Sequence, residues 1–239
     1  MSTAHSFELR QPMHAIQIRS DRAREVVQLF DLQDAIDEPP PAIDPAEHRQ
    51  ALRSLLPAPG QVALITGASG GGKSSLLRRL RRFRARHRWI DVQRMRLPDV
   101  PTVDCFGPDV PVLDALKQLS CVGLGEAWTY LRTPSEISDG QRWRLRLALA
   151  LHAAHRCEPT RDPLLVCDEF AALLDRLTAC VIARMLRRAV SEKGSRASAI
   201  VATSHADLID VLQPDVIVTC DFATIEVERR NSRDVTRRA

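Results

Sequence analysis

The sequence lacks the long apolar runs, the apolar leader and the cysteine pairs that mark several classes of protein. No apolar stretch reaches the roughly 18–20 residues that a membrane-spanning helix needs, so we expect no membrane insertion. The segment from Met1 to Gln11 carries no apolar stretch, and we expect no secretory signal there. The six cysteines form no C-x-x-C pair, which excludes zinc-binding spacing and favours free thiols in a reducing cytoplasm.

Lysine is also scarce, since it occurs only at Lys73, Lys117 and Lys193 in a chain with 34 basic residues and a net charge of +4. Coding bias accounts for the arginine excess as well as functional selection does. The 239 residues, 44% hydrophobic and 27% charged, are typical of a globular protein with one large domain. Lys73 stands out in this background, because the compact ammonium of lysine suits a phosphate-binding loop.

Two regions of different character divide the chain. Residues 1–57 include the run Glu38-Pro39-Pro40-Pro41 and are expected to form an N-terminal extension with a proline-rich, exposed connector. Residues 58–239 alternate short apolar runs with helical patterns, which predicts an α/β domain with a mostly parallel sheet flanked by helices. A helical subdomain is expected at about residues 98–157.

Apolar runs such as residues 62–66 are continuous, which predicts strands that are buried on both faces. In residues 1–57 a short strand 15–19 and helical segments 21–30 and about 45–56 are expected. In residues 58–239 the expected elements are strand 62–66, a helix from residue 73, strand 89–94, helical stretches 112–119 and 125–131, helix 142–155, strand 164–168, helix 176–191, strand 199–203, a short helix 206–212, and strands 216–220 and 224–227.

A glycine-rich loop lies between the first of these strands and the next helix. Residues 67–74, Gly-Ala-Ser-Gly-Gly-Gly-Lys-Ser, match G-x-x-x-x-G-K-[ST] at every fixed position. Glycines let backbone N–H groups wrap round phosphates, and the N-terminus of the helix adds positive potential. The pattern predicts a P-loop NTPase in which Lys73 reaches the β- and γ-phosphates of ATP and Ser74 binds Mg²⁺. The candidate nucleotide-binding residues of the loop are Gly67, Gly70, Gly72, Lys73 and Ser74.

Two carboxylates, Asp168 and Glu169, stand at the end of a later apolar strand, residues 164–168. At the carboxyl edge of a parallel sheet, such residues lie beside a bound nucleotide. Asp168 is therefore a candidate Mg²⁺ ligand, and Glu169 is a candidate for polarising an attacking water or hydroxyl. Taken alone, the pair also fits the start of a helix.

Three further motifs follow the P-loop in a fixed order. They are Ile137-Ser138-Asp139-Gly140-Gln141 before a long helix, Leu174-Asp175 after the acidic pair, and Thr203-Ser204-His205 after the next strand. Each is weak alone, since Ser-Asp-Gly is a common turn and a histidine after a strand is usually structural. In this order they resemble the motifs of ATP-binding cassette (ABC) ATPases, and the resemblance covers about residues 61–227.

The resemblance implies a head-to-tail homodimer that forms on ATP. In ABC ATPases each ATP lies between the P-loop of one subunit and the signature motif of the other. Carried onto this chain, Ser138 and Gly140 would approach the γ-phosphate held by Lys73 of the partner, and Gln141 would end the signature. A serine at a helix N-terminus suits phosphate binding, and the site would be complete only on closure.

The same resemblance assigns roles to three other residues. Glu169 resembles the general base, His205 resembles the switch residue at the γ-phosphate, and Asp175 resembles the loop that couples the two sites. Two departures accompany this match. Asp139 replaces the more usual glycine of the signature, and no glutamine stands at the family's Q-loop position, because Gln93 falls inside the expected strand 89–94.

The segment between the P-loop and the signature is shorter than in transporter subunits, which favours a small, soluble, non-transport ABC ATPase that acts on an unknown protein partner. Nucleic acid is a second candidate partner, because residues 78–88 pack seven arginines into eleven positions. A second arginine group lies at residues 229–238. A solvated basic face is the alternative, and the few aromatic residues give little support to a base-stacking platform.

Two other functions remain open. A kinase would use the same phosphate cradle and acidic pair to transfer the γ-phosphate to a hydroxyl, which could lie on DNA. A binding module would use ATP only to lock a dimer, with negligible turnover. The signature motif argues against a simple kinase, because a kinase needs no γ-phosphate contact from a second subunit.

Overall fold

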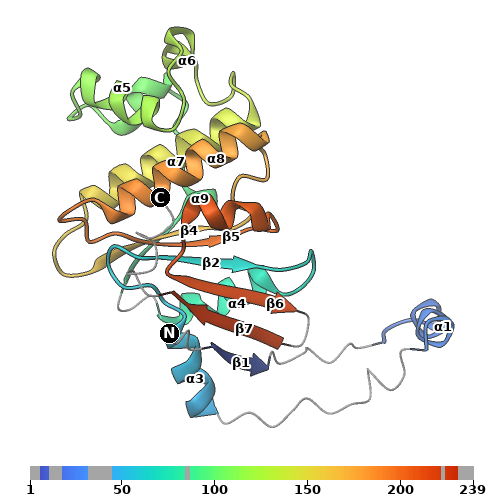
Figure 1. The fold of residues 1–239 in the computed structure, drawn as a ribbon. Coiled ribbons are helices and arrows are strands. Elements are labelled where there is room, and N and C mark those ends of the chain that lie inside the picture. Colours follow the sequence, from blue (N-terminus) through green and yellow to red (C-terminus); the bar gives the residue numbers. More distant parts are fainter. Residues whose placement is uncertain (1–5, 11–17, 32–44, 84–86, 222–223, 231–239) are drawn as a thin grey trace.

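A computed structural model describes residues 6–10, 18–31, 45–83, 87–221 and 224–230 (Figure 1). The strands are β1 (Ser6–Arg10), β2 (Val62–Thr66), β3 (His87–Asp91), β4 (Asp162–Cys167), β5 (Ser198–Ala202), β6 (Val216–Asp221) and β7 (Thr224–Arg229). The α-helices are α1 (Asp21–Leu29), α3 (Pro45–Ser54), α4 (Lys73–Leu80), α5 (Val112–Cys121), α6 (Ala127–Leu131), α7 (Asp139–His155), α8 (Arg176–Ser191) and α9 (Ile209–Leu212). Short 3-10 turns are η1 (Arg81–Phe83), η2 (Val92–Arg94), η3 (Thr102–Phe106) and η4 (Ala206–Leu208).

All seven strands form one sheet in the order β1-β7-β6-β2-β5-β4-β3. The five strands from β6 to β3 pair in parallel, whereas β7 and β1 add to the β6 edge in antiparallel orientation. The expected mostly parallel sheet is therefore confirmed. One strand boundary was wrong: β3 spans His87–Asp91, and the chain turns into η2 at Val92.

Helices cover both faces of the sheet (Figure 1). The side chains of β2 alternate, so that Val62 and Leu64 join the core beneath α7 and α8 while Ala63 and Ile65 join the core beneath α3 and α4. All four side chains are at most 1% exposed. This burial on both faces explains why the sequence of the strand is continuously apolar rather than alternating.

The helical stretches expected after the third strand are confirmed as α5 and α6. They pack with η3 on the side of α7 that faces away from the sheet (Figure 1). Leu119, Leu124 and Trp143 connect this group to the core on the α7 side. The bounds of a helical subdomain at residues 98–157 stay a prediction. Within the described residues, no helix is both long and apolar enough to cross a bilayer.

Elements of the N-terminal segment join the fold. β1 pairs with β7, with Phe7 opposite Val227. Leu52 and Leu55, on and just after α3, are buried in the core beside α4. The proline run lies outside the described residues, and the predicted division into residues 1–57 and 58–239 stays a prediction.

A buried carboxylate closes the end of the sheet away from the P-loop. Asp215 is 9% exposed and accepts a hydrogen bond from the Val62 backbone N–H at 2.8 Å. It also pairs with Arg187 of α8, with 2.5 Å between Nη1 and Oδ2. Its own carbonyl accepts from the Arg230 N–H at 2.9 Å. One residue thus connects β2, α8 and the end of β7.

Candidate nucleotide-binding site

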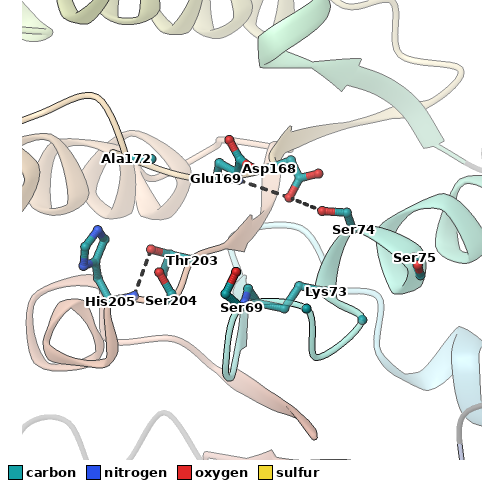
Figure 2. Close-up of a pocket in the computed structure, with 12 residues that line it drawn as sticks. Ser69, Lys73, Ser74, Ser75, Asp168, Glu169, Ala172, Thr203, Ser204 and His205 are labelled. Atoms are coloured by element: carbon teal, nitrogen blue, oxygen red, sulfur yellow. Dashed lines mark hydrogen bonds between the residues drawn. The ribbon is translucent and has the colours of Figure 1, made fainter. Parts of the chain in front are cut away.

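The carboxyl ends of β2, β4 and β5 bring the predicted phosphate-binding and acidic residues to one edge of the sheet. A cavity of about 430 Å³ lies there, between the glycine-rich loop and the segment that follows β5 (Figure 2). Its lining includes Gly70, Gly72, Lys73, Ser74, Asp168, Glu169 and His205. The structure therefore brings together three motifs that are more than 30 residues apart in sequence. Ser69, Thr203 and Ser204, which belong to the predicted motifs, complete the lining together with Ser75 and Ala172, which were not predicted.

The loop itself requires glycine at its first position. Gly67 has φ +128°, and a Cβ atom there would lie 2.1 Å from the carbonyl oxygen of Cys220 at the end of β6. A backbone atom cannot move aside as a flexible side chain can, so any side chain at position 67 would displace the loop or the strand. The close contact fixes the loop against the sheet edge.

The helix after the loop begins in a way that leaves its first N–H groups facing the cavity. Gly72, in the left-handed region at φ +97°, caps α4 without a side-chain acceptor. Unsatisfied N–H groups of this kind form an anion site. The Lys73 ammonium donates to the carbonyls of Gly67 and Ala68 at 2.8 and 2.7 Å, which keeps it above the loop.

A hydroxyl and a carboxylate meet at the side of the cavity. Ser74 Oγ donates to Asp168 Oδ1 at 3.1 Å, across 94 positions of sequence (Figure 2). Oxygen ligands of these two types are those that Mg²⁺ takes beside the phosphates of a nucleotide. The predicted magnesium residues therefore fit the ion: two protein oxygens side by side, at the mouth of a phosphate-binding loop.

Glu169 occupies an uncommon backbone conformation. Its φ is +45°, in the left-handed region that costs a residue with a Cβ about 1–2 kcal/mol. Asp168 Oδ1 accepts its backbone N–H at 3.1 Å, and the next N–H, of Phe170, donates to the Ala202 carbonyl at 2.8 Å. The Phe170 ring packs edge-on against Trp143 of α7, with ring centroids 5.3 Å apart. The fully buried phenylalanine anchors the turn that presents the exposed Glu169 side chain.

His205 lies on the opposite wall of the cavity from Asp168 (Figure 2). Its backbone N–H donates to Thr203 Oγ1 at 3.2 Å, and that hydroxyl donates to the Phe170 carbonyl at 3.3 Å. Thr203 is buried and so connects the histidine segment directly to the turn after Glu169. The sequence carried no signal for this bridge, because a threonine after a strand is ordinary.

The structure corrects the prediction for Gln93. The residue lies in η2, beyond the end of β3, and not inside a strand. Its amide clamps the backbone of Asp168: Oε1 accepts the Asp168 N–H at 3.2 Å, and Nε2 donates to the Asp168 carbonyl. A glutamine therefore does follow the third strand beside the acidic pair. An earlier strand end at Asp91, a polar residue after Trp89-Ile90, is the signal that was missed.

The predicted signature residues lie outside this cavity. Ser138 caps α7 in a reciprocal arrangement, in which its Oγ accepts the Gln141 N–H at 3.2 Å and Gln141 Oε1 accepts the Ser138 N–H at 3.0 Å. The Ser138 hydroxyl proton remains available to a phosphate oxygen. Asp139 pairs with Arg142, which is itself held by the carbonyls of Pro134 and Ile137. The Asp139 carboxylate thus has an ion-pair partner within its own turn.

Asp175 is also outside the cavity, where it caps α8. Its Oδ1 accepts the Thr178 N–H at 3.0 Å, and hydrogen bonds from Thr178 lower the pKa of this carboxyl. The segment just before it touches the signature: a Cβ atom on Gly140 would lie 3.1 Å from the Leu173 carbonyl oxygen. The predicted signature turn therefore lies close to Leu173 and Leu174, next to Asp175, within one chain.

Comparisons with known proteins agree with this geometry at the level of the fold. No model of a protein family matches the chain, and no curated protein matches it. Among solved structures, a post-hydrolysis dimer of the ATP-binding cassette MJ0796 with ADP and phosphate is 18% identical, with a TM-score of 0.50 over 70% of this chain and 84% of that one. The ADP conformation of MJ1267, a cassette of an ABC transporter, is 17% identical, with a TM-score of 0.51 over 74% and 83%. The parallel sheet, the glycine-rich loop and the acidic strand end described above thus belong to a known architecture, and the chain has the fold of the ABC ATPases.

Proposed function

We propose that this protein binds Mg-ATP in the cavity at the sheet edge and hydrolyses it. The observation that carries the proposal is the convergence of Lys73, the Ser74–Asp168 pair, Glu169 and His205 on one cavity of about 430 Å³. A phosphate-binding loop, a pair of metal-ligating oxygens and a free carboxylate are the components that ATP hydrolysis requires.

Each residue of the cavity has a distinct role in this proposal. Lys73 and the first N–H groups of α4 bind the phosphates and offset their charge. Glu169 orients a water against the γ-phosphate and accepts its proton, and His205 contacts the γ-phosphate from the other wall. Ser74 and Asp168 would hold Mg²⁺, which when bound neutralises charge on the β- and γ-phosphates.

We further propose that two copies assemble head to tail on ATP. Ser138 and Gly140 lie outside the cavity of their own chain, which supports a role at a second copy's site. There the free hydroxyl proton of Ser138 and the N-terminus of α7 would add donors to the γ-phosphate. Gln141 preserves the turn by capping it, and Asp175 caps α8 just after Leu173 and Leu174, which lie close to Gly140.

The decisive experiment follows the labelled γ-phosphate of ATP with purified protein. We expect free phosphate from the wild type and none above background from Glu169→Gln, because the amide accepts no proton. Binding of ATP by Glu169→Gln should persist, since the P-loop is unchanged. Label that appears on an added polynucleotide would contradict hydrolysis and favour phosphoryl transfer to a hydroxyl. Tight ATP binding with no turnover in the wild type would favour the binding module.

The partner and the cellular setting extend this proposal. We place the protein in the cytoplasm as a non-transport ABC ATPase, supported by its free thiols and by the short segment between the P-loop and α7. Of the two arginine groups, residues 84–86 and 231–239 lie outside the described part of the chain. The described members of these groups are Arg78 and Arg79 on α4, Arg81 and Arg82 on η1, Arg88 on β3, Arg229 on β7, and Arg230.

A further inference from the structure

A second cavity, of about 250 Å³, lies next to the nucleotide-binding cavity on the α4 side. The two cavities share Ser74, Asp168 and Glu169, so a ligand in the second would lie beside the magnesium and water positions proposed above. The motifs assigned to ATP binding do not account for this cavity, whereas Arg78 and Arg81 in its lining belong to the arginine run at residues 78–88. Its lining divides into a basic wall, an apolar floor and the shared acidic end.

The basic wall consists of Arg78 on α4 and Arg81 at the end of that helix. The Arg78 guanidinium is held in place by its own helix, since Nη2 donates to Ser75 Oγ at 2.9 Å and Nε donates to the Ser74 carbonyl at 3.4 Å. Arg81 is half-buried, and no ion pair or hydrogen bond of its guanidinium occurs with the described residues. Two cations without a carboxylate partner at this wall favour an anion with several oxygens, such as a phosphate.

The floor of the cavity is formed by apolar side chains of β3 and α4. Trp89 and Leu77 line it, and Trp89 is half-buried against the core beside α4. An indole next to two guanidinium groups suits a nucleotide, whose phosphate and base present a charge and a flat ring at a short distance from each other. Asp91 and Arg94 lie at the rim and form an ion pair at 3.4 Å, so the Asp91 carboxylate does not neutralise the charge of the basic wall.

We propose that the second cavity binds one nucleotide unit of a single-stranded nucleic acid, with its phosphate on Arg78 and Arg81 and its base on Trp89. A volume of about 250 Å³ admits one nucleotide, whereas a duplex cannot insert a paired base. Arg82, directly after Arg81 on η1, is exposed and adds positive charge for a neighbouring phosphate.

The position of the second cavity would let a bound nucleic-acid strand regulate the nucleotide-binding site. Gln93 lines the second cavity and clamps the backbone of Asp168, while Glu169 faces both cavities. A strand in the second cavity would therefore alter the orientation of the residues proposed to bind Mg²⁺ and water. The coupling between the nucleic acid and the nucleotide-binding site rests on the proposed ATPase function. The binding of the nucleic acid itself does not rest on it.

Fluorescence anisotropy of a labelled oligothymidylate of about 12 nucleotides tests the proposal on the full chain without ATP. Arg81→Glu should weaken binding about tenfold or more, and the slope of log K against log salt should become shallower by about 0.7, the share of one phosphate contact on a single strand. Arg188→Glu is the matched control: Arg188 is exposed on α8, across the sheet, and its reversal changes the net charge by the same amount.

Equal weakening by the two reversals would overturn the proposal, because it would show attraction to net charge alone. Equal binding of a duplex of the same sequence, or no binding of the oligonucleotide by the wild type, would also overturn it. Displacement of the strand by thymidine monophosphate at the same phosphate concentration would instead assign the cavity to small phosphate esters and overturn the strand assignment. Lys73→Ala separates the two proposals: it should abolish turnover and leave oligonucleotide binding unchanged.

Discussion

The nucleotide loop depends on one close contact, between position 67 and the carbonyl oxygen of Cys220. The contact places the loop against the end of β6, a strand more than 140 residues downstream. The glycine is thus needed for packing as well as for its backbone conformation. A substitution there tests whether ATP binding depends on the position of the loop as a whole.

We expect Gly67→Ala to abolish measurable ATP binding, because its Cβ would lie 2.1 Å from a backbone oxygen. Isothermal titration with Mg-ATP measures the loss. Gly60→Ala is the control: Gly60 also has a positive φ, +81°, but a Cβ at that position would meet no atom within 4 Å. The control should lose about 1–2 kcal/mol of stability and keep its ATP affinity. Unchanged binding by Gly67→Ala would contradict the role of this contact.

The stability of the fold depends on another single residue, Asp215. We expect Asp215→Ala to lower the free energy of unfolding by about 3 kcal/mol, because it leaves the Arg187 guanidinium and the Val62 N–H without their acceptor. Urea denaturation measures this change. Asp210→Ala, at an exposed position on α9, should change stability by less than about 0.5 kcal/mol. A loss of similar size in both variants would refute the structural role of Asp215.

At the scale of elements, the packing of α3 on α4 should depend on pH. His48 on α3 contacts Arg79 on α4, and burial, followed by the charge of Arg79, lowers the pKa of His48 from its usual 6.5. The unfolded chain therefore binds a proton more readily than the folded one, and the contact stabilises the fold above the unfolded pKa. That stabilisation is lost as the pH falls through 6.5 toward the lowered value.

We expect the stability advantage of the wild type over His48→Asn to shrink between about pH 7.5 and about pH 5.5. Thermal unfolding of both proteins across this range measures the difference. Burial also lowers the pKa of His152, so the variant should keep part of the pH dependence. A constant difference between the two proteins would show that His48 does not titrate in this window.

The order of elements from β2 to β7 could be predicted because each strand and helix carries its own periodicity. The end of β3 could not, since Val92 and Gln93 continue a pattern that fits a strand, and this error hid the clamp on Asp168. The P-loop and the acidic pair were predictable as local motifs. Thr203 and Asp215 were not, because their functions arise from contacts with residues distant in sequence. β1 was missed for the same reason, as its partner lies near the other end of the chain.

At the scale of the whole molecule, the proposed dimer brings the signature turn of one copy to the cavity of the other. We expect Glu169→Gln to elute as a dimer in size-exclusion chromatography with ATP, because closure would persist without hydrolysis. Adding Ser138→Arg should return the protein to a monomer, since the long side chain would occupy the contact with the γ-phosphate.

The control for this dimer is Ser191→Arg, in the Glu169→Gln background. Ser191 is exposed at the end of α8, far along the chain from the signature turn. The control protein should still elute as a dimer. A monomer in both cases, or a dimer in both, would refute the assignment of Ser138 to the interface.

The pairing of β1 with β7 has a consequence for how the protein is made. Ser6–Arg10 emerges from the ribosome about 200 residues before its partner, Thr224–Arg229. The β6–β7 hairpin is local and can form at once, whereas the first strand must wait for it. During this interval the early strand has unpaired backbone groups, and a nascent chain stalled before residue 224 would keep them exposed to other chains. Translation speed between these two strands therefore bears on the yield of folded protein.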